Sequence, residues 1–134
     1  MAAAEYWVEY ADSWRNAPLA FWVHIEQDGK PWINSKEFKP EVPKATPHRG
    51  FAIICVAVQG AVLHFSSVEQ LAECIRILSL NPLPTTRRLS ALRGTTLGPN
   101  RHWLSRLPAK LKSPKIRPSV VSALSEALRA NSII

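Results

Sequence analysis

The chain has 134 residues, of which 46% are hydrophobic, and it carries 17 basic and 10 acidic side chains for a formal net charge of +7. This length and composition predict one globular domain with its own core. They argue against a membrane-spanning chain or a membrane partner, because no apolar run approaches the roughly 20 residues that a bilayer requires. The first residues do not resemble a secretory signal peptide, so we expect a cytoplasmic protein of bacterial type.

The positive charge is concentrated in the second half of the chain. Residues 1–74 contain six basic and nine acidic side chains, whereas residues 75–134 contain eleven basic side chains and one acid, Glu126. Between Arg76 and Arg117 there are ten Arg or Lys and no Asp or Glu. An ordinary solvated surface mixes both signs. Because a surface of one sign attracts oppositely charged partners, the imbalance predicts a polyanionic or acidic partner.

Alternating hydrophobic residues predict β-strands in the first part of the chain. Residues 5–10 alternate, and residues 19–26 alternate in the same way. The dipeptide at 28–29 is Asp-Gly, which favours a tight turn, so a return strand is expected at 32–33. A proline directly before that strand cannot donate to a ladder and should keep it short or at an edge. Residues 34–50 are polar and proline-containing and are expected to form a long loop.

A hairpin and a helix are predicted next. Residues 51–58 are apolar on both faces, which is typical of a central strand. The Gln-Gly pair at 59–60 then predicts a two-residue turn with a return strand at 61–65. Ser66 or Ser67 is expected to cap a helix over residues 67–80, whose apolar residues recur at helical spacing; Ser67 with Gln70 gives an approximate capping box. The first half thus predicts an antiparallel sheet of four to five strands, packed by this helix.

The second half is predicted to form short helices separated by prolines. Helical pieces are expected from 85 to 94, from 102 to 107 and from 120 to 130. Asn100 and Ser119 are the expected caps of the last two pieces. Pro108 should end or kink the helix before it.

Together these patterns predict an α+β fold in a single domain, residues 1–134. Its β-rich part covers residues 1–66, and its basic, helical part covers residues 67–134. An apolar stripe is expected to hold the basic segment on the sheet, formed by Trp103, Leu104, Leu107 and Leu111.

No spacing of His, Cys, Asp or Glu along the chain matches a known metal, cofactor or nucleophile motif. His24 and Glu26 share one face of a predicted strand, which is more typical of a partly exposed strand surface than of a metal site. Cys55 and Cys74 lie in apolar surroundings and are expected to be buried thiols rather than a disulfide. We therefore predict no catalytic residue, no metal and no cofactor.

The basic segment combines the groups that contact phosphates, namely Arg and Lys, hydroxyl side chains and helix N-termini. The function predicted from this combination is a small, non-enzymatic DNA- or RNA-binding or accessory protein. The predicted contact residues are Arg87, Arg88, Arg93, Arg101, His102, Arg106, Lys110, Lys112, Lys115 and Arg117.

Three alternatives stay open on the sequence alone. The basic face can instead dock on an acidic protein surface, including one that normally receives nucleic acid, as an interaction module or inhibitor. A nuclease-like enzyme ranks below both and would need a histidine near the basic face, for which His64 and His102 are the nearest candidates. Trp7 and Trp22 could stack bases on the sheet, although core or interface packing is the stronger interpretation of both.

Overall fold

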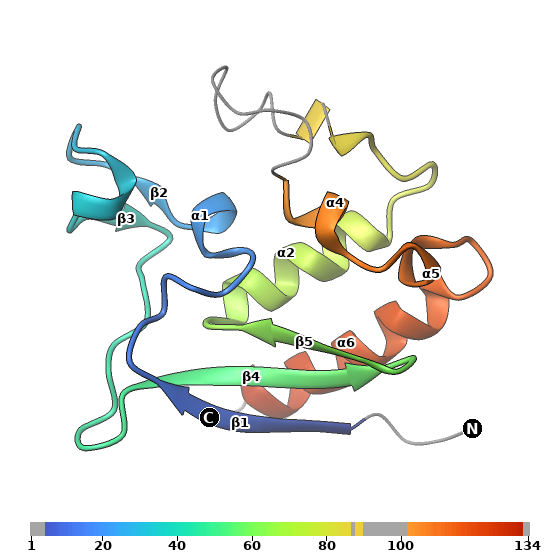
Figure 1. Ribbon diagram of the computed structural model, residues 1–134, viewed down its shortest axis with the longest axis horizontal. Helices are drawn as coiled ribbons and strands as arrows, with labels where there is room; N and C mark the ends of the chain where they lie inside the picture. Colours follow the sequence, from blue (N-terminus) through green and yellow to red (C-terminus); the bar gives the residue numbers. More distant parts are fainter. Residues whose placement is uncertain (1–4, 87, 90–101, 133–134) are drawn as a thin grey trace.

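The computed structural model describes residues 5–86, 88–89 and 102–132, and it has an α+β fold (Figure 1). Three strands form an antiparallel sheet in the order β1-β4-β5, and two short strands, β2 and β3, pair separately. The strands are β1 (Glu5–Ala11), β2 (Ile25–Glu26), β3 (Phe38–Lys39), β4 (Phe51–Val58) and β5 (Ala61–Phe65). The helices are α1 (Ala20–Val23), the 3-10 turn η1 (Trp32–Asn34), α2 (Val68–Leu78), α4 (Trp103–Arg106), α5 (Ala109–Lys112) and α6 (Arg117–Ser132).

The predicted hairpin is confirmed and forms the centre of the main sheet. β4 and β5 pair antiparallel from Val58 opposite Ala61 at the turn to Ile54 opposite Phe65. Gln59 and Gly60 both have positive φ, 51° and 82°, as a two-residue type I′ turn requires. β4 is the central strand, with β1 on one side and β5 on the other. Its successive residues Ile53 to Val56 point to alternate faces of the sheet and are all buried, which agrees with its continuous apolar sequence.

The helices α2 and α6 cover one face of this sheet. Of the two predicted caps, Ser67 is the one that caps α2, because its hydroxyl oxygen accepts a hydrogen bond from the Gln70 amide at 3.2 Å. The main core lies between α2, α6 and the sheet and includes Leu71, Leu124 and Val56, all fully buried. The opposite sheet face, which we call the open face, carries alternate residues of β1, β4 and β5.

The strand predicted at residues 19–26 is wrong. Residues 20–23 form the helical turn α1, and only Ile25–Glu26 are extended. The buried positions explain the difference, because Ala20 and His24 are one helical turn apart and both have an exposed fraction of 0%. Alternation of apolar residues was therefore misleading here.

The return strand predicted at residues 32–33 is also wrong. Residues 32–34 form η1, and β2 pairs instead with Phe38–Lys39, inside the segment predicted to be a loop. Asp28 holds the intervening loop, because its carboxylate accepts hydrogen bonds from the Ser35 hydroxyl at 2.7 Å and the Lys36 amide at 3.1 Å. The Ser35 bond, followed by the Lys36 bond, lowers the pKa of Asp28 to about 2. The sheet is therefore split in two rather than continuous over four or five strands.

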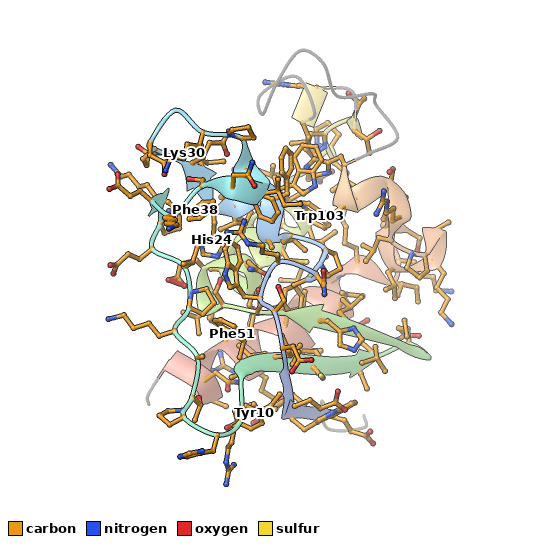
Figure 2. The ribbon with its side chains drawn as sticks, turned by 60° about the vertical axis from the view of Figure 1, so that its left-hand side comes forward. Tyr10, His24, Lys30, Phe38, Phe51 and Trp103 are labelled. Atoms are coloured by element: carbon orange, nitrogen blue, oxygen red, sulfur yellow. The ribbon has the colours of Figure 1, made fainter. Side chains whose placement is uncertain are left out.

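Residues 12–50, called here the small lobe, pack around a separate aromatic cluster. Trp14 and Phe38 are buried, and their ring centroids are 5.3 Å apart in an edge-to-face arrangement. The Arg15 guanidinium lies 4.7 Å from the Trp14 ring centroid and donates to the carbonyl oxygens of Trp32 and Ser35. Figure 2 shows Phe38 above Phe51, where the lobe meets the start of β4. Arg15 is thus fully engaged in holding this lobe together.

The helical second half differs from expectation in its boundaries. The last helix begins at Arg117, three residues earlier than predicted, and Pro118 sits in its first turn, where a proline is well tolerated. Ser119 is therefore inside the helix, and its hydroxyl donates to the Ile116 carbonyl oxygen at 2.7 Å. The break at Pro108 is confirmed, since it separates α4 from α5.

The segment between α2 and α4 is described only in part. The helix predicted over 85–94 lies largely outside the described residues, and the predicted cap Asn100 lies wholly outside them. Within the described part, the Thr85 hydroxyl oxygen accepts a hydrogen bond from the Arg88 amide at 3.2 Å. None of the helices in the described ranges is long and apolar enough to cross a bilayer.

Candidate functional site

The short helices α4 and α5 are fixed to the core by the predicted apolar stripe. Trp103, Leu104 and Leu111 have exposed fractions of 4%, 1% and 0%, and Leu107 packs against the same core. Large buried side chains of this kind hold a segment in one position. The stripe is confirmed, and the basic side chains beside it sit on an ordered backbone.

We call the positive side chains of α4, α5, the turn at 113–116 and the start of α6 the basic ridge: Arg106, Lys110, Lys112, Lys115 and Arg117. The side chains of Arg106, Lys110 and Lys115 are exposed, and none of the three forms an ion pair with a carboxylate among the described residues. Lys112 donates to the Leu104 carbonyl oxygen at 3.2 Å, and Arg117 donates to the Lys112 carbonyl oxygen at 3.4 Å. Two cations therefore tie the ridge together and three project from it.

α5 and the start of α6 lie side by side at the right-hand end of the molecule, and α4 lies nearer its middle (Figure 1). Lys110 also approaches the β4–β5 turn, because its Nζ lies 3.8 Å from the position of a Cβ placed on Gly60. The sequence from 102 to 125 has no Asp or Glu. The segment that forms the ridge therefore carries positive side chains and no negative side chain of its own.

The remaining predicted contact residues are not part of this ridge. Arg88 is exposed beside a groove that Arg76 and Leu80 also line, near the end of α2. Arg87, Arg93 and Arg101 lie outside the described residues.

His102 is inside the protein rather than on the predicted contact face. Its exposed fraction is 4%, and its Nδ1 accepts the Leu104 amide at 3.1 Å as the cap of α4. Its ring packs against Trp22 and Trp103, with centroids 4.6 and 5.2 Å away. Desolvation by burial lowers the pKa of His102 to about 4, against a weaker opposing effect of Glu73. His102 is therefore a neutral structural cap, and the ridge is built without it.

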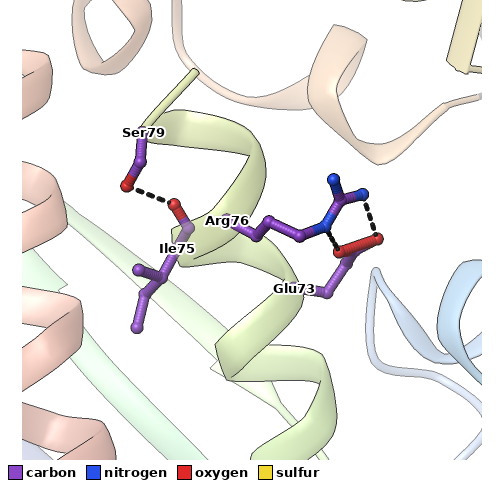
Figure 3. A network of polar contacts seen from close by, with 4 residues as sticks. All are labelled: Glu73, Ile75, Arg76 and Ser79. Atoms are coloured by element: carbon purple, nitrogen blue, oxygen red, sulfur yellow. Dashed lines mark hydrogen bonds and ion pairs between the residues drawn. The ribbon is translucent and has the colours of Figure 1, made fainter.

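Arg76, in the same half of the chain, is a cation whose charge is neutralised by a carboxylate. On the exposed side of α2 its guanidinium donates through two nitrogens to the two carboxylate oxygens of Glu73, one turn earlier (Figure 3). The Ser79 hydroxyl donates to the Ile75 carbonyl oxygen at 2.6 Å at the end of the same helix. Arg76 already has a partner, unlike the three projecting cations of the ridge.

A second group of polar side chains lies on the open face of the sheet, and the sequence pattern did not reveal it. Glu9, Cys55 and His64 come from β1, β4 and β5, and their potential ligand atoms all lie within 4.8 Å of one another. Burial, followed by the charge of Glu9, raises the pKa of the Cys55 thiol. A thiol with a raised pKa is a poor nucleophile, so this group does not resemble a cysteine-hydrolase site.

His24 does not share a strand face with Glu26, because it is the fully buried C-cap residue of α1. Its Nδ1 is 3.0 Å from the Pro40 carbonyl oxygen, and its Nε2 is 2.9 Å from the Ser67 hydroxyl. A carbonyl oxygen only accepts, so Nδ1 carries the proton and Ser67 donates to Nε2 while it accepts the Gln70 amide. This chain of bonds joins the small lobe to the start of α2 and has a structural role.

An apolar cavity of about 220 Å³ separates β5 from α4. Arg106 and His64 both line it, so it lies between the basic ridge and the open face. Its apolar lining includes Leu19, Leu63, Phe65, Trp103 and Leu107.

The two tryptophans considered for base stacking do not share a sheet face. Trp7 is on the open face with an exposed fraction of 39%. Trp22 is on α1, where its ring contacts Phe21 and His102. An aromatic platform of these two residues is therefore ruled out.

Comparison with protein families, with curated proteins and with solved structures gives no match to this chain.

Proposed function

We propose that this protein binds nucleic acid, as a DNA- or RNA-binding or accessory protein, and that the basic ridge contacts the phosphates. The observation that carries the proposal is the state of Arg106, Lys110 and Lys115. They are exposed and lack a carboxylate partner among the described residues. Arg106 and Lys110 project from α4 and α5, and Lys115 projects from the turn between α5 and α6; Leu104, Leu111 and Ile116 of these segments pack in or against the core.

The physical basis is the release of counterions from a phosphate backbone. Each phosphate that a Lys or Arg neutralises releases condensed cations, which favours binding at low salt. An anchored cation loses less freedom on binding than one on a disordered tail, because its backbone is already ordered. Contacts of this type position a protein on nucleic acid and read no sequence, so we propose binding with little sequence preference.

The same chemistry fits an acidic protein surface, and the decisive measurement is therefore direct. Fluorescence anisotropy with labelled duplex DNA, single-stranded DNA and RNA of equal length, at two salt concentrations, measures affinity and salt dependence together. With four or five phosphate contacts, the slope of log affinity against log salt on duplex DNA should be roughly −3.6 to −4.5.

A charge-matched pair of variants tests the location of the binding surface. The ridge variant carries Arg106→Glu, Lys110→Glu and Lys115→Glu. The control variant carries Lys30→Glu, Lys39→Glu and Lys44→Glu, which are exposed positions in the small lobe. Both lose the same net charge, but only the ridge variant should lose affinity by about 100-fold or more.

Two results would contradict the proposal. Absence of binding to all three nucleic acids at low salt would remove it and favour an acidic protein partner. Equal losses in the two variants would show that total charge, and not the ridge, determines binding.

A further inference from the structure

The group on the open face is assembled by strand pairing. Cys55 on β4 is directly opposite His64 on β5, and Trp7 on β1 is opposite Cys55 on the other side. Glu9 is two residues after Trp7 on the same face of β1, so it approaches Cys55 diagonally. Each of three adjacent strands thus provides one potential ligand, and the register of the sheet fixes their relative positions.

The three side chains form a donor set suited to zinc. They offer a thiolate sulfur, an imidazole nitrogen and a carboxylate oxygen, all within 4.8 Å of one another. Zinc binds these three donors at about 2.0–2.3 Å, in a tetrahedron whose ligand atoms are separated by roughly 3.3–3.7 Å. A single carboxylate beside sulfur and nitrogen does not suit magnesium or calcium, which prefer several oxygen ligands.

To bind zinc, the three ligand atoms must approach one another by about 1 Å, and the movement would come from the two exposed side chains. Glu9 and His64 are exposed, whereas Cys55 has an exposed fraction of 0%. A fixed sulfur at the centre of the sheet and two adjustable ligands at its sides allow a tetrahedral arrangement to form by side-chain rotation alone.

The surroundings also orient one of the ligands. The Trp7 indole Nε1 donates to the Glu9 carboxylate at 3.0 Å. Hydrogen bonds from outside the ligand set hold metal-binding carboxylates in place and commonly change metal affinity by 10–100-fold. Placement on strands rather than loops gives further precision.

We propose that Glu9, Cys55 and His64 bind a zinc ion on the open face, with its fourth position available to water or to another ligand. This site is separate from the basic ridge and does not depend on the proposed function. The two positive charges of the ion would be balanced by the Cys55 thiolate and the Glu9 carboxylate, and the bound ion would lie on the same face as the exposed side chains of Trp7 and Val62.

Cobalt(II) is the probe, because it replaces zinc in such sites and reports its ligands by absorption. Titration of the full-length, reduced protein should give one equivalent of bound cobalt, visible d–d bands of tetrahedral intensity and a near-ultraviolet band from a thiolate ligand. One equivalent of zinc should displace it. Cys55→Ser should abolish the thiolate band, whereas Cys74→Ala, at the other buried cysteine, should keep it.

The exposed ligands have matched controls. His64→Asn and Glu9→Gln should each weaken cobalt binding by more than about tenfold, and Trp7→Phe, which removes only the donor to Glu9, by about tenfold. His48→Asn and Glu5→Gln change an exposed histidine and an exposed β1 carboxylate outside the group and should have no effect.

The outcomes are decisive even if Cys55→Ser fails to fold, because His64 and Glu9 are exposed and their variants should keep the circular dichroism spectrum of the parent. A thiolate band that survives Cys55→Ser, or equal effects of Glu9→Gln and Glu5→Gln, would overturn the proposal. Failure to bind cobalt at micromolar protein would overturn it as well and would leave nucleic-acid binding by the ridge unaffected.

Discussion

The basic ridge and the open face of the sheet are two candidate sites built in opposite ways. The cations of the ridge are close together in the chain, between residues 106 and 117, on two short helices, the turn after them and the start of α6. Glu9, Cys55 and His64 are up to 55 positions apart, and only the pairing of three strands brings them together. The ridge depends on anchoring, whereas the group on the open face depends on register.

The two regions also differ in charge and in how far other elements cover them. The open face carries Glu5 and Glu9 on a strand whose residues 5–10 are all exposed, and β1 pairs with β4 alone among the described strands. The ridge lies over the other edge of the sheet, where α4 and β5 line one cavity. A substitution that removes the apolar contacts of α4 should therefore affect the ridge and spare the open face. A substitution that disturbs the pairing of β1 with β4 should do the reverse.

Removal of the anchor should have the largest effect. Trp103→Ala removes a ring that is 4% exposed and should lower the free energy of unfolding by about 3–5 kcal/mol. Trp7→Ala removes the same side chain from the open face, where it is 39% exposed, and should lower it by about 1 kcal/mol or less. Urea denaturation followed by circular dichroism measures both. Similar losses would show that α4 is not the anchor of the ridge.

Acid should destabilise the anchored region through His102. The pKa of His102 is lowered to about 4 in the folded protein, chiefly by desolvation, and is 6.5 without that burial. The unfolded chain therefore binds a proton that the native state excludes, and stability falls as the pH drops from about 6.5 to about 4. The full loss is at most about 3 kcal/mol.

A variant and a control isolate this contribution. His102→Asn keeps an acceptor at the cap but no titrating ring, so the free energy of unfolding should depend less on pH between 4 and 6.5. Leu111→Ala lowers stability without removing a titrating group, so it should lower the whole curve and keep its slope. An unchanged slope in His102→Asn would assign the acid sensitivity to other groups.

The junction of β1 and β4 gives a way to disturb register alone. Gly50 has a φ of +97°, and a Cβ there would lie 2.5 Å from the Ala11 carbonyl oxygen at the end of β1. Gly50→Ala should therefore displace the end of β1 and cost about 2 kcal/mol. Gly29 has a φ of +72° but open space around its Cβ, so Gly29→Ala should cost about 1 kcal/mol.

Hydrogen exchange distinguishes this local change from general destabilisation. In Gly50→Ala the β1 amides should lose protection and cobalt binding should weaken, while nucleic-acid binding by the ridge stays within about twofold under folding conditions. Loss of ridge binding at constant fold would show that the two regions are coupled.

The same contrast explains what sequence patterns could predict. The hairpin at 51–65, the cap at Ser67 and the apolar stripe at Trp103 and Leu111 depend on neighbouring residues and were predicted correctly. The small lobe was not, because Trp14, Phe38 and the Asp28 carboxylate organise it through contacts between residues far apart in the chain. Apolar alternation at 19–26 could not indicate which of those residues the lobe would bury.

The group on the open face was missed for a related reason. A search for ligand spacing along the chain cannot find residues that meet across strands. One signal was present, however, because a two-residue turn at Gln59-Gly60 already places Cys55 opposite His64. The third ligand, Glu9, required the pairing of β1 with β4, which the sequence does not determine.

The smallest expected effect concerns a single cation of the ridge. Arg106→Gln removes one exposed charge next to the cavity and should weaken nucleic-acid binding several-fold, equally for all sequences. It should also make the slope of log affinity against log salt shallower by about 1. Lys44→Gln removes the same charge from the exposed loop on the far side of the molecule (Figure 1) and should leave the slope unchanged.

A slope that changes equally in both would mean that the ridge makes no localised phosphate contact. A slope that changes only in Arg106→Gln would place that guanidinium on the nucleic-acid backbone, because a long-range effect of net charge acts alike from both positions.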